Sequence, residues 1–162
     1  FLFDNPMLNN LFVYGTLKKG HLRSRMWPRA PQTIRTALAR GRLLDLGAYP
    51  GLIPGEDWVL GELWTLASED VLETLEVLDQ VEGYDSATDR GLYIRREIPV
   101  WLTDPMDRVP GTVGTDAYTY LIADQQLIAE ARQIPPWVPV GDRFASQWPD
   151  SRSRVPARLE DE

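Results

Sequence analysis

The hydrophobic pattern of this chain changes its period after residue 66, and that change limits the folds open to it. Residues 59–66 follow an alternation that suits a strand better than a helix. In residues 69–82 the period becomes helical, with Ser68 as a plausible N-cap, acidic residues in the first turn and Gly83 as the natural stop. The pattern therefore predicts a strand followed directly by a helix over residues 69–82.

Strand patterns outnumber helical patterns elsewhere. Segments rich in β-formers predict strands over residues 11–14, 40–46, 93–102 and 117–122. Turn formers crowd residues 48–55, a shorter helix is expected over residues 124–133, and proline and glycine enforce irregular chain after residue 135. We expect an α+β fold with a curved or barrel-like sheet, formed by one domain over residues 1–145 and followed by a polar surface tail over residues 146–162.

Composition excludes several kinds of function. The chain has no cysteine and a single histidine, His21, so disulfides, thiolate nucleophiles, a Ser-His-Asp triad and multi-histidine metal sites are not expected. A net charge of −7 argues against nucleic acid and anionic membranes as partners. No window resembles a membrane span or a secretory signal, and a cytoplasmic location is expected. Any acid/base chemistry must come from Asp, Glu, Lys or Tyr.

Glu82 stands where the helical pattern predicts an apolar residue. Val71, Leu75 and Leu78 form one apolar stripe, and Glu82 continues it four residues after Leu78. Partial burial and the negative end of the helix dipole would both raise the pKa of this carboxyl, which suits a group that accepts and returns a proton. The alternative is that the helix frays before Gly83, so that Glu82 turns into solvent or makes a structural hydrogen bond.

A loop with a glycine at each end follows the first predicted strand. Residues 15–20 read GTLKKG, and successive backbone N–H groups in such a loop can form a nest that holds a small carboxylate. The spacing of Gly15, Gly20 and the lysines does not fit the phosphate-binding pattern G-x-x-x-x-G-K-[ST]. An ordinary turn after a strand is the alternative for this loop.

Five short segments together resemble the γ-glutamylcyclotransferase-like (AIG2-like) family, in the family's order and spacing. They are VYGTLKKG at 13–20, DLGAYPGL at 45–52, GELW at 61–64, LDQVEGY at 78–84 and YIRR at 93–96. The resemblance spans residues 11–122. It implies a small mixed, mainly antiparallel β-barrel with helices packed on it, and a cavity at the mouth lined by the first loop.

The resemblance also implies roles for individual residues. Glu82, the acidic residue before Gly-Tyr, would be the general acid/base. The first loop would bind the γ-glutamyl end of a substrate largely through backbone amides, at Tyr14, Gly15, Thr16 and Leu17. Tyr120 and Tyr93 could add hydroxyl donors to the cavity, although aromatic residues on strands more often fill a core. Of these two, only Tyr120 is included among the predicted substrate-binding residues.

The implied activity is that of a cofactor-independent lyase or acyltransferase. The α-amine of a γ-glutamyl group attacks its own γ-carbonyl, closes the ring of 5-oxoproline and expels the attached amine. The expected partner is thus a small γ-glutamyl compound, and no metal, nucleotide or other cofactor is needed. Two alternatives stay open. One is a module that binds a small carboxylate or amine without turnover, and the other is a related acyl-transfer or hydrolase role in biosynthesis.

Overall fold

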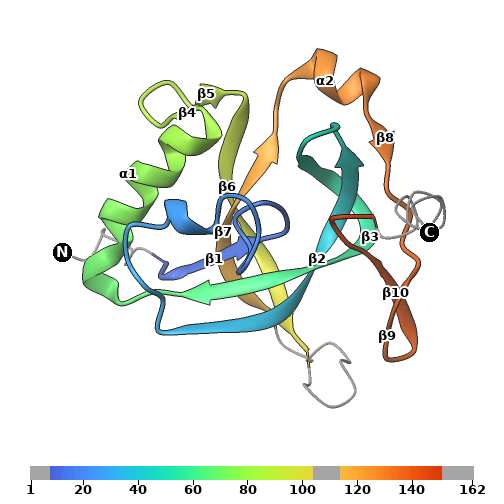
Figure 1. Ribbon diagram of the computed structural model, residues 1–162, viewed down its shortest axis with the longest axis horizontal. Coiled ribbons are helices and arrows are strands. Elements are labelled where there is room, and N and C mark those ends of the chain that lie inside the picture. Colours follow the sequence, from blue (N-terminus) through green and yellow to red (C-terminus); the bar gives the residue numbers. More distant parts are fainter. Residues whose placement is uncertain (1–7, 104–113, 151–162) are drawn as a thin grey trace, which may run out of the picture.

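The computed structural model describes residues 8–103 and 114–150, and its centre is a closed ring of five strands (Figure 1). The ring strands are β1 (Asn10–Val13), β2 (Thr33–Asp45), β3 (Pro50–Thr65), β6 (Tyr93–Leu102) and β7 (Thr115–Ile122). Neighbours follow the order β2-β6-β7-β1-β3, and pairing between β3 and β2 closes the ring. β1 and β7 pair in parallel and the other ring neighbours are antiparallel. The expected α+β class with a mixed, mainly antiparallel barrel is confirmed.

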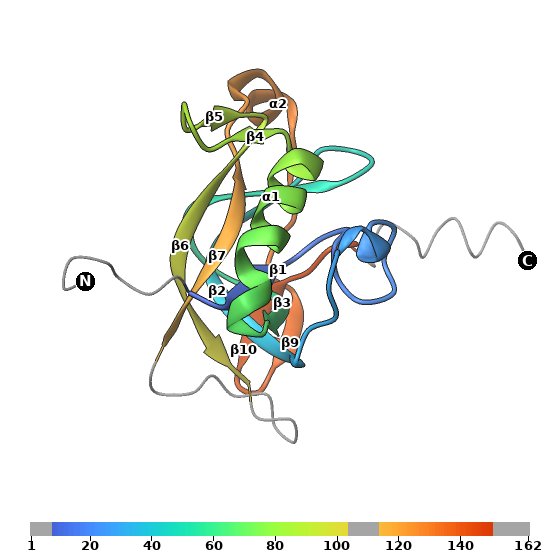
Figure 2. The same ribbon diagram turned by 90° about the vertical axis from the view of Figure 1, so that its left-hand side faces the viewer.

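Shorter elements extend and cover this ring. The short strands are β4 (Tyr84–Asp85), β5 (Arg90–Gly91), β8 (Arg132–Gln133), β9 (Val138–Val140) and β10 (Arg143–Ser146). The helices are α1 (Val71–Glu82) and α2 (Gln125–Glu130), with 3-10 turns at Ser24–Met26 and Ser68–Asp70. α1 lies along the barrel, and α2 lies at the same end of the molecule as β4 and β5 (Figure 2). In the part of the chain that the structure describes, no helix is long and apolar enough to cross a membrane.

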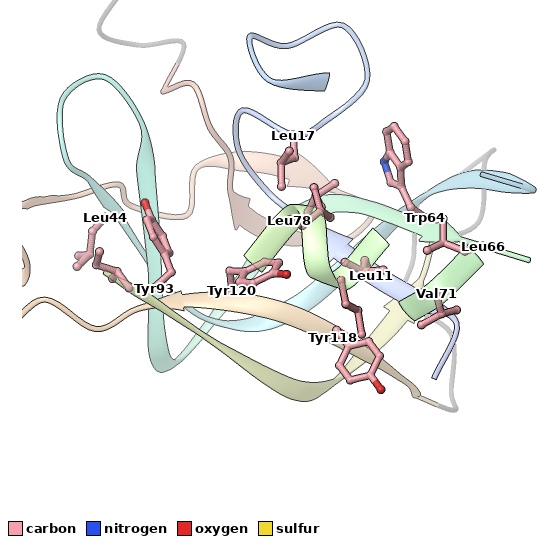
Figure 3. Packing of buried hydrophobic residues seen from close by; sticks show 13 residues of the cluster. Leu11, Leu17, Leu44, Trp64, Leu66, Val71, Leu78, Tyr93, Tyr118 and Tyr120 are labelled. Atoms are coloured by element: carbon pink, nitrogen blue, oxygen red, sulfur yellow. The ribbon is translucent and has the colours of Figure 1, made fainter. Parts of the chain in front are cut away.

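Two clusters of buried side chains hold the ring and α1 together. One draws residues from all five ring strands, namely Phe12, Ala37, Ala39, Leu43, Leu52, Val59, Leu63, Val100 and Ala117, and adds Tyr14 and Ile134. The other joins α1 to the barrel through Val71, Leu75 and Leu78 and includes Tyr93 and Tyr120 (Figure 3). Because the apolar stripe of α1 faces the barrel, the last turn of the helix is brought against the sheet.

The helix ends as its sequence predicts but begins differently. Gly83 adopts a left-handed conformation (φ +68°), and its N–H donates to the carbonyls of Asp79 and Gln80, which terminates α1. Ser68 does not cap the helix with its side chain. It opens a 3-10 turn instead, and α-helical structure starts at Val71.

The segment expected to be a turn over residues 48–55 lies largely in a strand. β3 begins at Pro50, because proline is tolerated as the first residue of a strand. Gly51 then allows close packing, since a Cβ there would lie 2.7 Å from Ile122 Cγ2. The second predicted helix is also shorter than expected: Asp124 caps α2 by accepting from the Leu127 N–H at 3.0 Å, and Arg132 and Gln133 pair with β2.

The first residues of the expected tail contain buried side chains. Ser146, the expected start of the tail, is buried in β10 and donates to the Ile134 carbonyl at 2.7 Å. Asp150 is also buried and accepts from Trp137 Nε1 at 3.2 Å. Side-chain hydrogen bonds thus hold both ends of the segment 146–150, which its polar composition did not reveal. The remainder of the expected tail, residues 151–162, lies outside the described residues.

Candidate active site

A pocket with about 360 Å³ of empty space, part of it open to solvent, lies where the first loop, α1, β6 and β7 meet. All six predicted site residues line it, namely Tyr14, Gly15, Thr16, Leu17, Glu82 and Tyr120. Six further residues complete the lining: Phe12, Val13, Arg23, Tyr49, Pro50 and Tyr93. The fold therefore gathers the residues singled out in the sequence into one hollow.

Glu82 is the last residue of α1 and lines this pocket, where its carboxyl interacts electrostatically with Arg23, Tyr93 and Tyr120. The helix does not fray before Gly83, and the side chain is half-buried. Burial raises the pKa of the Glu82 carboxyl to about 7, while the positive charge of Arg23 opposes the rise. Near neutral pH this carboxyl can hold a proton or release one at little cost, which general acid/base chemistry requires.

Three tyrosines line the pocket, and the hydroxyl of each already donates a hydrogen bond within the protein. Tyr14 donates to the Tyr120 carbonyl at 2.6 Å, Tyr93 donates to the Pro50 carbonyl at 2.6 Å, and Tyr120 donates to Asp79 Oδ1 at 2.7 Å. The expectation that Tyr93 and Tyr120 add hydroxyl donors is therefore wrong, because a hydroxyl has one proton. What these oxygens still offer is lone pairs.

The first loop lines the same pocket with residues 15–17. It turns back on itself, since the Lys18 N–H donates to the Gly15 carbonyl at 3.1 Å and the Arg23 N–H donates to the Thr16 carbonyl at 2.7 Å. Within residues 8–103 and 114–150, no acceptor takes a hydrogen bond from the amides of Gly15, Thr16 or Leu17. These three N–H groups can receive an anionic or carbonyl oxygen.

Arg23 is a pocket residue that the sequence reading did not single out. The turn that closes at Thr16 brings it back over the pocket, where its guanidinium carbon lies 5.7 Å from the centre of the Tyr49 ring. It is the cation of the pocket lining and faces the carboxyl of Glu82 closely enough to lower its pKa. A basic residue in a polar stretch carries no sequence signal for such a position.

The comparisons with known proteins agree with this geometry. The family model described as "Gamma-glutamyl cyclotransferase, AIG2-like" matches residues 11–142. The chain belongs to this family. A relative in Niallia circulans, named gamma-L-glutamyl-butirosin B gamma-glutamyl cyclotransferase, is 41% identical over 93 residues, which are 56% of this chain and 57% of that protein. The chain therefore matches less than two thirds of that relative's length.

Solved structures agree at the level of the fold. An AIG2-like protein from Mus musculus aligns with a TM-score of 0.55 at 20% identity, covering 89% of this chain and 92% of that one. An Arabidopsis thaliana protein solved in solution aligns with a TM-score of 0.53 at 18% identity, covering 97% and 79%. The barrel of this γ-glutamyl cyclotransferase family member is thus the fold found in those proteins.

The match to the γ-glutamyl cyclotransferase family ends at residue 142, yet residues beyond it hold the first loop. Lys18 is buried, and its Nζ donates to the Trp148 carbonyl at 2.6 Å. Burial lowers the pKa of this ammonium to about 8, while Glu62 opposes that effect. Glu62 also accepts from the Lys19 N–H at 2.8 Å. The loop is therefore fixed from outside the pocket by β3 and by residues 146–150.

Metal ligands do not gather in this site. Within the described ranges, no group of three or more His, Asp or Glu side chains could hold a metal ion.

The raised pKa of Glu82 predicts how stability depends on pH. The folded state holds the Glu82 proton more tightly than the unfolded state, so the stability gained from it is complete below pH 4.5 and is lost as pH rises through about 7. At about 1.4 kcal/mol per pKa unit, the loss is on the order of 3 kcal/mol. Glu82→Gln should therefore unfold like the parent at pH 4.5 and be more stable than the parent at pH 8.

Urea unfolding at both pH values measures this difference. Glu76→Gln is the matched control, because Glu76 lies on the same helix and is exposed. A gain for Glu82→Gln of equal size at both pH values, or an equal gain for Glu76→Gln, would contradict the assignment of the effect to a buried carboxyl.

Proposed function

We propose that this protein is a γ-glutamyl cyclotransferase, which cyclises the γ-glutamyl group of a small amine or peptide to 5-oxoproline and releases the amine. One observation carries the proposal: a carboxyl with a pKa of about 7 shares a pocket with three backbone amides that donate to no acceptor among the residues that the structure describes. Membership of the γ-glutamyl cyclotransferase family supports the same chemistry. Glu82 acts as general acid/base, and Tyr14, Gly15, Thr16, Leu17 and Tyr120 bind the substrate.

The pocket has two sides of opposite character. Arg23 and the amides of residues 15–17 supply hydrogen-bond donors, which suit the α-carboxylate and the γ-carbonyl oxygen of a γ-glutamyl group. Glu82 and the lone pairs of Tyr93 and Tyr120 supply acceptors, which suit its α-ammonium. When the α-carbon groups and the γ-carbonyl are held at the same time, the side chain of the γ-glutamyl group bends between them. The α-nitrogen is then brought near the γ-carbon.

The proton balance fits a single carboxyl. The α-ammonium begins with three hydrogens and the ring nitrogen of 5-oxoproline keeps one, so two protons pass to the leaving nitrogen, which departs as an ammonium ion. Glu82 takes the first proton, which frees the lone pair that forms the new C–N bond. The same group then protonates the leaving nitrogen as the old C–N bond breaks, and it relays the second proton in the same way.

A substrate panel tests the proposal. The purified protein is incubated with glutathione, γ-glutamyl dipeptides, γ-glutamyl amines and, because the Niallia circulans relative is named for it, γ-L-glutamyl-butirosin B. Mass spectrometry should detect 5-oxoproline and free amine from at least one member. Free glutamate in place of 5-oxoproline would identify a hydrolase, and binding without turnover would identify a binding module. Either result would overturn the proposal.

Arg23→Gln should raise the KM for the best substrate by about ten- to a hundredfold, because a hydrogen bond to a charged group contributes about 1.5–3 kcal/mol. Steady-state kinetics at pH 8.5, where Glu82 is ionised in both proteins, measures the change. Arg25→Gln is the matched control, because Arg25 lies two residues away and is exposed. The 4-aminobutanoyl analogue lacks the α-carboxylate, so its KM should be the same in the parent and in Arg23→Gln. A rise of equal size for both compounds would refute the carboxylate contact.

A further inference from the structure

Tyr120 connects the pocket to a buried acid that is not part of its lining. Its side chain extends from β7 toward α1 (Figure 3), where its hydroxyl donates to Asp79 Oδ1 at 2.7 Å. Asp79 lies one helical turn before Glu82 and is 8% exposed. A phenol whose O–H donates a hydrogen bond to a carboxylate becomes a better hydrogen-bond acceptor at its oxygen, because that bond polarises the O–H group.

Asp79 is itself held in place by a cation. Arg95 Nε lies 3.2 Å from Asp79 Oδ1, in an ion pair without hydrogen-bond geometry, and both side chains are largely buried. The Arg95 guanidinium lies over the rings of Tyr84 and Tyr118, with its carbon 5.5 and 5.4 Å from their centres. Arg95 therefore compensates the buried charge of Asp79 and keeps its carboxylate directed at the Tyr120 hydroxyl.

We propose that Asp79, held by Arg95, is a positioning residue that fixes the direction of the Tyr120 hydroxyl, so that Tyr120 presents an acceptor to the α-amino group of the substrate. This inference rests on the proposed function for the identity of the substrate. Asp79 itself does not touch the substrate.

The geometry carries a chemical consequence. If the Tyr120 proton were free to rotate, it could point into the pocket and meet the ammonium of the substrate donor to donor. With the proton committed to Asp79, only lone pairs face the ammonium, whose three N–H groups need acceptors besides Glu82. The nitrogen is then held in place both before and after Glu82 removes its first proton.

Steady-state kinetics in the parent protein and in Tyr120→Phe test the inference. Asp79→Leu combined with Arg95→Met removes the ion pair without leaving a buried charge alone, which keeps the cost in stability small. Tyr120→Phe and this pair should each lower kcat/KM by about tenfold, the effect of one hydrogen bond. The pair should cause no further loss in Tyr120→Phe. The inference would be overturned if the pair lowered kcat/KM equally in the parent and in Tyr120→Phe, or if it did not lower kcat/KM in the parent.

Two more variants complete the design. Asp79→Asn retains an oxygen acceptor for Tyr120 and serves as the second test if the paired substitution does not fold. Its kcat/KM should stay within about threefold of the parent, and any loss that persists in Tyr120→Phe would overturn the inference. The matched control removes the exposed ion pair of Asp89 with Arg96, whose Oδ1 and Nη1 lie 2.7 Å apart, and should leave kcat/KM unchanged.

Binding without turnover separates this inference from the proposed activity. Calorimetry compares 2-aminohexanoate, which has an α-ammonium but no γ-carbonyl, with hexanoate. The parent should bind 2-aminohexanoate more tightly, and Tyr120→Phe or the Asp79/Arg95 pair should reduce that preference by about tenfold. A parent that shows this preference but releases no 5-oxoproline would refute the activity alone. A parent that binds both compounds equally would refute the inference.

Discussion

Glu82→Gln is expected to lower kcat for the release of 5-oxoproline by about 10²- to 10⁴-fold, the usual contribution of a positioned acid/base group. Glutamine keeps the shape of the side chain and one accepting oxygen but cannot take up or release a proton in this reaction. Because Glu82 is also one of the acceptors for the α-ammonium, KM should rise as well, but by less than kcat falls. Single-turnover measurements with the best substrate of the panel separate the chemical step from product release.

The pH profile gives a second signature of the same group. Because burial places the pKa of Glu82 at about 7, the rate for the parent should rise with pH through this value as the carboxylate forms. Glu82→Gln should lose this rise together with its activity. Glu76→Gln keeps the same helix and loses an exposed carboxylate, so it should retain parental kcat. Unchanged activity in Glu82→Gln would remove Glu82 from the mechanism.

Gly15→Ala is expected to have the second largest effect, because the first loop has no room for a side chain at this position. A Cβ on Gly15 would lie 2.6 Å from Pro50 Cγ and 2.9 Å from Pro50 Cδ. The Pro50 ring cannot move aside easily, since its carbonyl accepts from Tyr93 and it pairs with Asp45 at the start of β3. Overpacking of this kind lowers the free energy of unfolding by about 1–3 kcal/mol.

The same substitution should lower kcat/KM by about 10²-fold, because the amides of Gly15 and Thr16 are displaced and small displacements are costly in a reacting site. Pro50→Ala removes the two ring atoms in the clash and provides the control. Combined with Gly15→Ala, it should restore most of the lost unfolding free energy, so the two changes are strongly non-additive. Additive losses in urea unfolding would show that Gly15 is required for another reason.

The sequence anticipated the centre of the site better than its surroundings. Glu82 could be found because one carboxylate interrupts an apolar stripe of known period, and the first loop could be found because its glycines follow a strand. Asp79 had a weaker signal. It precedes Glu82 by one helical turn, but an acid beside Leu78 also fits an ordinary helix boundary between apolar and polar faces. Its role depends on the register of β6 and β7, which bring Arg95 and Tyr120 opposite each other.

The fold, too, was predicted from the sequence in some parts and not in others. Strands with clear patterns, such as β6 over Tyr93–Leu102, were predicted with their full length. The first part of β3 was not, because Pro50 and Gly55 resemble turn residues unless their neighbours in space are known. The role of residues 146–150 was hidden for a related reason. A polar segment can be buried when each group finds a partner, and those partners, such as the Ile134 carbonyl for Ser146, are set by tertiary structure.

The contact between Lys18 and the Trp148 carbonyl bears on the order in which the molecule is completed during synthesis. A ribosome releases Lys18 early and Trp148 about 130 residues later, as the spacing in the chain requires. Until Trp148 has been synthesised, the Lys18 ammonium lacks this acceptor, and the first loop lacks the hydrogen bond that anchors it there. The first loop would thus reach its final position late in translation, after all five strands of the ring have left the ribosome.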